Sequence, residues 1–464
     1  MFDVCIIGCG IVGAAVAYEL SRYDLSVAVI EKENDVATGS TKANSAIIHA
    51  GYDPEPGSLM ARLNVEGNRL AASFCDSLDV PHMHCGALVL AFSEREAATL
   101  AQLLQRGREN GVPDLRILPR DEVLEIEPAL SGEVVAALYA PTAMIVDPWQ
   151  YTLALAETAV RNGCSLHLET AVTGIEPSPL GYLLQTSQGF IETRTLINAA
   201  GLYADDIHNM VAPPAFHVQP ARGEYWLLDK SEGQRVSRVI FQCPSDAGKG
   251  VLVAPTVHGN LIVGPNSAPS EGRNDVSTTA QGLHFVRETA RKSVPGLDFS
   301  ANIRNFSGNR AATEHSDFII TEPRPGFIDL AGIKSPGLSA APAIAKLAVS
   351  MLEKGGLALH EKQNFIDMRK KAPPSGRVVC RCETVTEGEL RAALHAPIPP
   401  RSVDSVKRRC GAGMGRCQGG FCAPRVVDLL AEHYNCKPTD VLQDGRGSHI
   451  LVSETKRGLC TDTI

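Results

Sequence analysis

Residues 2–31 read FDVCIIGCGIVGAAVAYELSRYDLSVAVIE. Phe2–Ile7 is an apolar run with β-branched residues, which predicts a buried parallel strand. A G-x-G-x-x-G pattern follows, and then an Ala/Leu-rich stretch, Ala14–Arg22, with helical propensity. A second apolar run, Ser26–Ile30, ends at Glu31. This order of strand, glycine turn, helix, strand and acid predicts a dinucleotide-binding unit.

Each part of this stretch has a physical reason. Gly8 allows the tight turn, Gly10 lets the backbone approach a pyrophosphate, and Gly13 lets the helix lie close to the strand. The helix N-terminus offers free N–H groups and a partial positive charge to the diphosphate. Glu31 can accept hydrogen bonds from both ribose hydroxyls. A glycine turn without a ligand is the alternative, which the flanking elements disfavour. The motif does not separate FAD from NAD, but its N-terminal position and a second contact segment favour FAD.

Composition narrows the class of protein. A chain of 464 residues is long enough for two or three domains, and its net charge of −8 argues against broad nucleic-acid binding. No apolar run approaches the ~18–20 residues of a transmembrane helix, and the N-terminus has no basic region of a signal peptide. We therefore expect a cytoplasmic protein, peripheral to a membrane only through a partner.

Seven of the thirteen cysteines fall in the last 89 residues, which indicates metal or redox chemistry rather than disulfides.

Further segments are suited to a cofactor. Residues 38–51 (TGSTKANSAIIHAG) are small and hydroxyl-rich, as a segment wrapping a flavin would be. Asn198–Gly201 follows an apolar strand with small residues that let backbone pack on a ligand. A second helix N-terminus near Gly337 is expected to face the flavin. The predicted FAD shell is Gly8, Gly10, Gly13, Glu31, Ser40, Thr41, Ala200, Gly201, Gly337 and Leu338.

The rest of the chain gives a coarse outline. Residues 166–197 contain three strand-like runs. Residues 217–305 are also strand-like in sequence and include an expected hairpin at Leu252–Gly264. The other expected elements are a helix-like piece at Gln102–Gly111, a helix at Trp149–Asn162, a strand at Phe327–Ala331, a helix at Ala341–Glu353 and a linker at Lys370–Arg377.

Five segments of the chain together resemble the D-amino-acid-oxidase-like superfamily of FAD oxidoreductases. They are the N-terminal G-x-G-x-x-G unit, Asn44–Gly51, Asn198–Gly201, Phe306–Arg310 and Gly332–Leu338. Within this superfamily the chain is similar to glycerol-3-phosphate dehydrogenases and L-2-hydroxyglutarate dehydrogenases. Two segments, residues 44–53 (NSAIIHAGYD) and 335–345 (SPGLSAAPAIA), are closer in sequence to the L-2-hydroxyglutarate dehydrogenases. The resemblance implies an α/β fold whose Rossmann-like FAD-binding domain is built from separated segments. It also implies a substrate domain with a mixed or antiparallel sheet.

The C-terminal cysteines form C-x-C, a gap of 34 residues, and C-x4-C, at Cys380, Cys382, Cys417 and Cys422. Four thiolates on short loops suit either a 2Fe–2S cluster or structural zinc. We expect nearby cations to offset the thiolate charge. Those cations are Arg381, Lys407, Arg408, Arg409 and Arg416.

The pattern is similar to bacterioferritin-associated-ferredoxin-like 2Fe–2S domains, which favours the cluster over zinc or a metal-free domain. Cys410, Cys436 and Cys460 fall outside it and are interpreted as non-ligands. The expected domains are residues 1–369 for the flavoenzyme, 370–377 for the linker and 378–464 for a small four-cysteine iron–sulfur domain. Within the flavoenzyme, FAD-binding segments cover about residues 1–80, 150–216 and 306–365, and the substrate domain about 81–149 and 217–305.

Oxidation of a secondary alcohol needs a hydride acceptor, a base and cations for an anionic substrate. His49, at the end of the flavin-wrapping segment, is the candidate base, and a covalent histidyl–flavin bond stays open. The resemblance makes Arg310 and Lys334 the anion clamps, with surface cations as the alternative. Tyr225, Thr256 and His258 are weaker candidates for lining the substrate face.

The favoured function is oxidation of sn-glycerol 3-phosphate to dihydroxyacetone phosphate, with electrons leaving through the 2Fe–2S cluster to a partner protein. Ser-Pro-Gly-Leu after Lys334 departs from the glycerol-3-phosphate pattern. The alternatives are L-2-hydroxyglutarate or another 2-hydroxy acid, an amine or opine, and a non-catalytic electron-transfer subunit.

Overall fold

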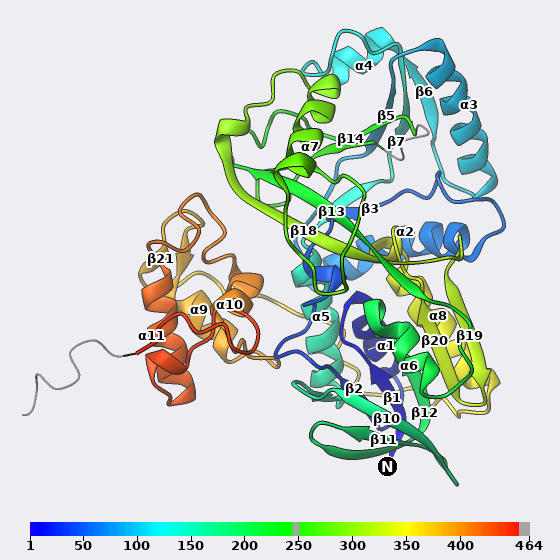
Figure 1. Cartoon of the computed structure of the whole chain (residues 1–464), viewed down its shortest axis with the longest axis vertical. Coiled ribbons are helices and arrows are strands. Elements are labelled where there is room, and N and C mark those ends of the chain that lie inside the picture. Colours follow the sequence, from blue (N-terminus) through cyan, green and yellow to red (C-terminus); the bar gives the residue numbers. More distant parts are fainter. Residues whose placement is uncertain (245–249, 454–464) are drawn as a thin grey trace, which may run out of the picture. The chain divides into compact units, whose positions relative to one another are not determined.

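A computed structural model describes residues 1–244 and 250–453 of the chain (Figure 1). It divides into two compact units. The first unit comprises Met1–Lys32 and Val36–Arg369, and the second comprises Glu33–Asp35 and Lys370–Ile464. Among the helices of the described residues, none is long and apolar enough to cross a membrane.

An eight-stranded sheet of the first unit is built around the N-terminal strand, β1 (Phe2–Ile7). This strand pairs in parallel with β2 (Val27–Ile30) on one side and with β12 (Gly189–Asn198) on the other. The strand order is β10-β11-β12-β1-β2-β9, with β20 beside β12 and β19 beside β20. The remaining strands are β9 (Ser165–His167), β10 (Val172–Ser178), β11 (Gly181–Thr186), β19 (Ile319–Arg324) and β20 (Phe327–Ala331).

The first and last of these strands, β1 and β20, have the bounds that the sequence predicts. The region of three expected strand-like runs holds four strands, because β9 adds a short edge strand beside β2. Helix α1 (Ile11–Leu20) begins three residues earlier than expected, directly after the glycine turn, and packs against α5 (Pro148–Arg161) and α8 (Gly337–Lys354). The carboxyl end of β1 therefore leads straight into a helix N-terminus, which is where a dinucleotide binds in such folds.

A second, nine-stranded sheet has the order β17-β13-β16-β15-β14-β5-β7-β6, with β18 paired to β13. The two long strands, β13 (Val218–Leu228) and β18 (Asn302–Thr313), pair antiparallel along their length (Figure 1). The hairpin predicted at Leu252–Gly264 is confirmed as β15 (Leu252–Pro255) and β16 (Leu261–Gly264). The other strands are β5 (Ala87–Ala91), β6 (Arg116–Pro119), β7 (Ala136–Ala140), β14 (Val239–Gln242) and β17 (Ala268–Pro269).

Helices cover both faces of this second sheet. Leu88 and Leu90 of β5 pack in one apolar cluster with Val286 of α7 (Ala280–Ser293), whereas Ala87 and Val89 pack in another with Leu100 of α3 (Glu94–Glu109). Alternate residues of a strand point to opposite faces, so α7 and α3 lie on opposite sides. The remaining elements of the first unit are α2 (Leu59–Ser77), α4 (Arg120–Ile126), α6 (Ala204–Asn209), β3 (Ile47–Ile48), β4 (His82–His84) and β8 (Met144–Val146).

The prediction of strand-like structure throughout residues 217–305 is wrong for α7. The Thr279 hydroxyl accepts a hydrogen bond from the Gly282 N–H and caps this helix. Its buried residues Gly282, Val286 and Ala290 recur every four positions, which is a helical spacing.

The second unit is small, and its regular structure is mostly helical. A short antiparallel pair, β21 (Val378–Cys380) and β22 (Val385–Thr386), precedes three helices, α9 (Glu387–Leu394), α10 (Val403–Cys410) and α11 (Ala423–Tyr434). The first two helices start at capping boxes, on Thr386 and on Ser402. Leu390, Val406 and Leu430 belong to one apolar core that holds the three helices together.

Candidate functional site

The glycine turn after β1 is sterically specified. Gly8 has φ +99°, and a Cβ there would lie 2.5 Å from the Ala199 carbonyl oxygen. A Cβ on Gly13 would lie only 1.9 Å from the Gly8 carbonyl oxygen, so α1 crosses the turn too closely for any side chain. Gly8 and Gly13 thus have the turn and packing roles that their spacing predicts.

Gly10 differs from its two neighbours in the motif because a Cβ there would meet one side-chain atom and no backbone atom. The nearest atom to a Cβ there would be Thr41 Oγ1 at 3.3 Å. Gly10 is the N-cap of α1, and no side chain caps the helix at that residue. Such a cradle of backbone beside a helix N-terminus fits a diphosphate.

Glu31 is buried, with 8% of its surface exposed, and its Oε2 accepts a hydrogen bond from the Cys9 N–H at 2.8 Å. The carboxylate therefore lies beside the glycine turn, where a ribose would be. Thr41 Oγ1 accepts from the Ile11 N–H at 3.1 Å, and the Ser40 hydroxyl donates to the Asn309 carbonyl at 2.6 Å. These predicted FAD contacts, far apart in sequence, lie around one turn, and the donor set fits the adenosine diphosphate part of FAD.

Asn198–Gly201 closes the other side of the turn. Asn198 Nδ2 donates to Asp329 Oδ1 at 2.7 Å, and Asn198 Oδ1 accepts from the Ala200 N–H. His208 Nδ1 contacts Asp329 Oδ2 at 2.6 Å, and burial raises the pKa of the Asp329 carboxyl. This buried network holds Ala200 and Gly201 beside the first strand. Sequence reasoning misses both His208 and Asp329, because α6 and β20 are far apart in the sequence and come into contact only in the folded chain.

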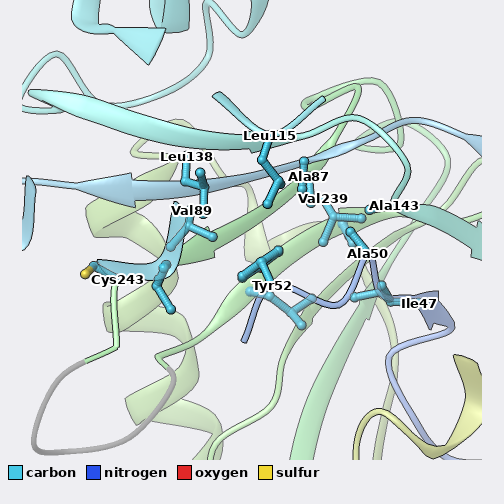
Figure 2. Close-up of a cluster of buried hydrophobic side chains, with 14 of the residues drawn as sticks. Ile47, Ala50, Tyr52, Ala87, Val89, Leu115, Leu138, Ala143, Val239 and Cys243 are labelled. Atoms are coloured by element: carbon cyan, nitrogen blue, oxygen red, sulfur yellow. The ribbon is translucent and has the colours of Figure 1, made fainter. Parts of the chain in front are cut away.

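The hydroxyl-rich segment, residues 38–51, is anchored in the core around His49. Ile47, Ala50 and Tyr52 are buried in one apolar cluster with residues of β5, β7 and β14, as Figure 2 shows. Gly51 has φ +110°, and a Cβ there would lie 2.5 Å from Val65 Cγ2. The backbone on both sides of His49 is therefore fixed.

His49 itself is held through its backbone. Its N–H donates to Ser339 Oγ of α8 at 2.7 Å. Its carbonyl accepts from Asn64 Nδ2 at 3.0 Å and Asn68 Nδ2 at 3.1 Å. The half-buried imidazole lies 5.7 Å from the Phe241 ring. This geometry brings His49 to the first turn of α8, next to Gly337 and Leu338, while the residue stays half-buried.

Arg310 lies on one face of the β13–β18 pair together with Tyr225. In the antiparallel register Arg310 is opposite Ala221, and Phe306 is opposite Tyr225, whose ring it stacks on at 4.7 Å. A Cβ on Gly223 would lie 2.8 Å from Arg310 Nη2, so the guanidinium occupies the space that this glycine leaves. Arg310 Nη2 also donates to the Asn266 carbonyl at 3.4 Å.

Tyr225 joins this face to the flavin-wrapping segment. The Tyr225 hydroxyl lies 3.2 Å from Ser45 Oγ, and a Cβ on Gly308 would lie 2.0 Å from the Ala43 carbonyl oxygen. The strand that carries Arg310 therefore runs closely against residues 43–45. A half-buried cation, an aromatic hydroxyl and the segment of His49 are brought together, as an anionic alcohol substrate requires.

The other predicted site residues have contacts of their own. Lys334 is half-buried, and its Nζ donates to the His315 carbonyl, two residues beyond β18. Thr256 Oγ1 accepts from the Asn260 N–H inside the hairpin turn, and His258 Nε2 contacts Asp147 Oδ2, the cap of α5, at 2.9 Å. Lys334 therefore stays a predicted clamp, and a substrate contact of Thr256 or His258 stays a prediction that their present partners do not favour.

The four cysteines of the second unit fall into two contact pairs. The Cys380 thiol is hydrogen-bonded to that of Cys422, and the Cys382 thiol to that of Cys417. The Cys422 contact lowers the pKa of Cys380 to about 5 and raises the pKa of Cys422 in return. In the described part of the chain, no three Cys, His, Asp or Glu side chains surround one point as ligands of a single ion.

Two thiol pairs are the donor set of a dinuclear cluster, in which each iron takes two cysteines. The loop also fits a cluster: a Cβ on Gly415 would lie 2.3 Å from Cys382 Cβ, so only glycine lets the two ligand loops meet. Cys410 Sγ instead donates to the Val406 carbonyl, and Cys436 is exposed. Cys460 lies outside the described residues.

The expectation that Lys407, Arg408 and Arg409 offset the thiolate charge is wrong. Lys407 pairs with Asp404 at 2.8 Å, and both arginines pair with Asp35. All three cations are buried and already engaged by carboxylates. Arg381 does lie at the cysteine loops, with its guanidinium carbon 4.2 Å from the Phe421 ring centroid.

Comparison with known proteins agrees with the two expected cofactors, FAD and a 2Fe–2S cluster. Residues 3–351 match the FAD dependent oxidoreductase family, and residues 378–432 match the BFD-like [2Fe-2S] binding domain. A glycerol 3-phosphate dehydrogenase of Caloramator mitchellensis is 48% identical, with 98% of this chain and 99% of the relative covered. A glycerol 3-phosphate oxidase of Mycoplasma genitalium is 34% identical, with 78% and 97% covered.

One further relative is named for a different substrate, and one solved structure is named for the same glycerol phosphate chemistry. An L-2-hydroxyglutarate dehydrogenase of Escherichia coli K12 is 34% identical over 68% of this chain and 72% of the relative. Among solved structures, dithionite-reduced L-α-glycerophosphate oxidase of Mycoplasma pneumoniae with FAD bound has a TM-score of 0.75 and 33% identity, covering 79% of this chain and 98% of its own.

Proposed function

Since the chain belongs to the FAD-dependent oxidoreductase family and carries a 2Fe–2S domain, we propose that it oxidises sn-glycerol 3-phosphate to dihydroxyacetone phosphate. The observation that carries the proposal is the 48% identity to a glycerol 3-phosphate dehydrogenase over nearly the whole of both chains. The resemblance to L-2-hydroxyglutarate dehydrogenases is weaker and leaves about a third of this chain unmatched. L-2-Hydroxyglutarate is therefore the second candidate substrate.

The residues of the first unit have distinct roles in this reaction. FAD supplies the hydride acceptor when bound. His49 takes the hydroxyl proton from the substrate, and its backbone contacts to Ser339, Asn64 and Asn68 keep the ring in place. Arg310 binds the phosphate, for which a planar guanidinium is suited. Lys334 adds a second positive charge from the segment before α8.

The 2Fe–2S domain gives the electrons of the reduced flavin a route to an acceptor protein, besides direct reaction of the flavin with oxygen. Oxidation of the alcohol releases two electrons, whereas a 2Fe–2S cluster accepts one at a time. The two Mycoplasma oxidases match 78% and 75% of this chain, close to the share that the first unit occupies, while the dehydrogenase relative matches 98% of it. This contrast favours a dehydrogenase that passes single electrons to an acceptor protein.

A substrate panel tests the proposal. The purified protein is mixed anaerobically with sn-glycerol 3-phosphate, its sn-1 enantiomer, L-2-hydroxyglutarate, L-lactate and L-proline, and flavin absorbance is followed. We expect the fastest bleaching with sn-glycerol 3-phosphate. Faster bleaching with L-2-hydroxyglutarate would transfer the assignment to that substrate, and no bleaching with any hydroxy compound would contradict both.

A further inference from the structure

Glu224 of β13 carries a carboxylate that is fully buried, with 0% of the residue exposed. Its Oε1 accepts a hydrogen bond from the Thr279 N–H, and its Oε2 accepts one from Asn266 Nδ2, both at 2.5 Å. Helix α7 packs on β13 (Figure 1), and a Cβ on Gly282 would lie 1.5 Å from Glu224 Oε2. Only glycine in the first turn of α7 therefore leaves room for this carboxylate, which has one fixed position.

Glu224 holds the side chain of Asn266 at both ends of its amide. Asn266 Oδ1 accepts from the Glu224 N–H at 2.8 Å, while Asn266 Nδ2 donates to Glu224 Oε2. The amide cannot be turned over without losing both bonds, because its oxygen faces a donor and its nitrogen faces a carboxylate. Asn266 lies in the irregular segment 265–267 between β16 and β17, so Glu224 fixes the course of a segment that no strand pairing holds.

This segment reaches Arg310. Arg310 Nη2 donates to the Asn266 carbonyl at 3.4 Å, and Arg310 makes no other side-chain hydrogen bond or ion pair with residues 1–244 and 250–453. A Cβ on Gly223 would lie 2.7 Å from Pro265 Cβ and 2.8 Å from Arg310 Nη2, so both side chains lie over this glycine. Residues 265–266 thus position the guanidinium and leave its other N–H groups for a ligand.

We propose that Glu224 is a positioning residue, which acts through Asn266 to aim the Arg310 guanidinium at the anionic end of the substrate. The inference rests on the proposed function, in which Arg310 is the anion clamp. In the β13–β18 register Arg310 is opposite Ala221, three residues from Glu224, so Glu224 and Arg310 point to opposite faces of the sheet. A carboxylate on the face of Arg310 would repel an anionic substrate, whereas Glu224 orients the clamp from the other face.

Orientation matters for a guanidinium more than for a point charge. It binds phosphate or carboxylate best through two parallel N–H···O bonds, which requires its plane to be fixed. A long side chain that is ordered only when the ligand binds costs affinity. Because Asn266 supplies this order in advance, loosening it should raise KM for an anionic substrate and leave kcat and flavin content nearly unchanged.

Exchanging the acid and the amide between the two residues tests the proposal. E224Q turns an NH₂ group toward Asn266 Nδ2 or toward the Thr279 N–H, and N266D places two carboxylates face to face. E224Q/N266D restores the pattern, because the new carboxylate accepts both from the N–H of residue 224 and from the new amide. We expect KM for sn-glycerol 3-phosphate to rise roughly three- to tenfold in each single variant, as loss of one buried hydrogen bond gives, and to return to the wild-type value in the double variant.

A binding measurement separates this proposal from the assignment of the substrate. The dissociation constant of inorganic phosphate is measured from the absorbance change of the oxidised flavin, and it should follow the same order among the variants. The substrate panel on the wild type decides which alcohol is oxidised, whereas the ratio of variant to wild type in phosphate binding decides the role of Glu224. Each can therefore fail without the other.

E127Q is the matched control, because Glu127 is also a buried carboxylate, 2% exposed, but its partners are Ser237 and Arg238. E127Q should lower the thermal midpoint without changing phosphate binding. N266A keeps Glu224 and removes only the half-buried amide, so it carries the test if E224Q does not fold. Wild-type phosphate binding in N266A or E224Q, an equal loss in E127Q, a double variant as weak as the single ones, or a wild type that binds no phosphate would overturn the proposal.

Discussion

Asp35 and Arg409 form a bidentate, buried ion pair, with Oδ1–Nη2 at 2.8 Å and Oδ2–Nη1 at 2.9 Å, although 374 residues separate them in sequence. Arg408 also donates to Asp35 Oδ2, at 2.9 Å. Two guanidinium groups outweigh the burial of the carboxyl and lower the pKa of Asp35 to about 2. Asp35 is therefore part of the second unit, to which it contributes the central carboxylate of a buried network.

Replacing Asp35 with Asn should destabilise the second unit by roughly 3–5 kcal/mol, because two buried arginines would lose their counter-charge. D444N is the matched control: Asp444 pairs with Arg408 and its side chain is 28% exposed, so about 1 kcal/mol or less is expected. The measurement is the denaturant midpoint at which cluster absorbance is lost. Equal midpoints for D35N and the wild type would refute the role of Asp35.

The pH dependence of this effect has a definite sign. A carboxyl with a lowered pKa stabilises the fold at all pH values above its unfolded pKa, and that stabilisation is lost only as the pH falls toward about 2. The difference between D35N and the wild type should therefore be constant from pH 6 to pH 8. A difference that shrinks within this range would show that another group is titrating.

The three glycines of the N-terminal motif should respond differently to substitution. Gly10→Val should leave the fold intact and give protein without FAD, because its Cβ would meet only the Thr41 hydroxyl, at 3.3 Å, while its methyl groups would lie at the N-terminus of α1 where we expect the diphosphate. Gly13→Ala should prevent folding, since its Cβ would lie 1.9 Å from the Gly8 carbonyl oxygen. Gly445→Ala, in the second unit and with nothing within 4 Å of its Cβ, is the control and should bind FAD normally. Circular dichroism and the flavin-to-protein absorbance ratio distinguish the three, and full flavin occupancy in Gly10→Val would contradict the assignment.

Arg310→Ala should lower kcat/KM for the best substrate by the equivalent of roughly 2–5 kcal/mol if the guanidinium pairs with a buried anion. Gly223→Ala should reproduce part of this loss without removing the charge, because its Cβ would lie 2.8 Å from Arg310 Nη2. Flavin content should stay unchanged in both variants. Unchanged kcat/KM in Arg310→Ala would place the anion clamp elsewhere.

Cys410 should behave as a half-buried thiol packed against the core and not as a ligand. Burial raises the pKa of Cys410 to about 12, so the thiol stays protonated and unreactive at pH 8. Iodoacetamide at that pH should modify the exposed Cys436 and leave Cys410 unmodified in folded protein. C410S should keep the cluster EPR signal that C417S abolishes, and loss of the signal in C410S alone would contradict the ligand set.

The sequence predicts those parts of the molecule whose cause is local. The glycine turn, the acid at Glu31 and the four-cysteine spacing each depend on neighbouring residues, so each can be located without knowledge of the fold. The ion-pair partner of Arg408 and Arg409 could not be predicted, because Asp35 is more than 370 residues away in sequence and nothing in its neighbouring residues indicates the pairing. Likewise, nothing in the sequence of Ser339 indicates that its hydroxyl holds the His49 backbone.

Helix α7 escapes prediction for a different reason. Its sequence carries a helical signal, the Thr279 cap and buried residues four apart, but most of the regular structure around it, from β13 to β18, consists of strands of one sheet. The pairing of Cys380 with Cys422 and Cys382 with Cys417 is a property of how two loops meet, which spacing alone does not specify.

The central claim, a flavin-dependent oxidation coupled to a one-electron cluster, has a direct test. The protein is reduced anaerobically with sn-glycerol 3-phosphate, frozen, and examined by EPR alongside a sample reduced by dithionite. We predict that the substrate alone produces the 2Fe–2S signal seen with dithionite, and that turnover with a one-electron acceptor exceeds peroxide formation in air. A bleached flavin with a silent cluster and rapid peroxide formation would contradict the account.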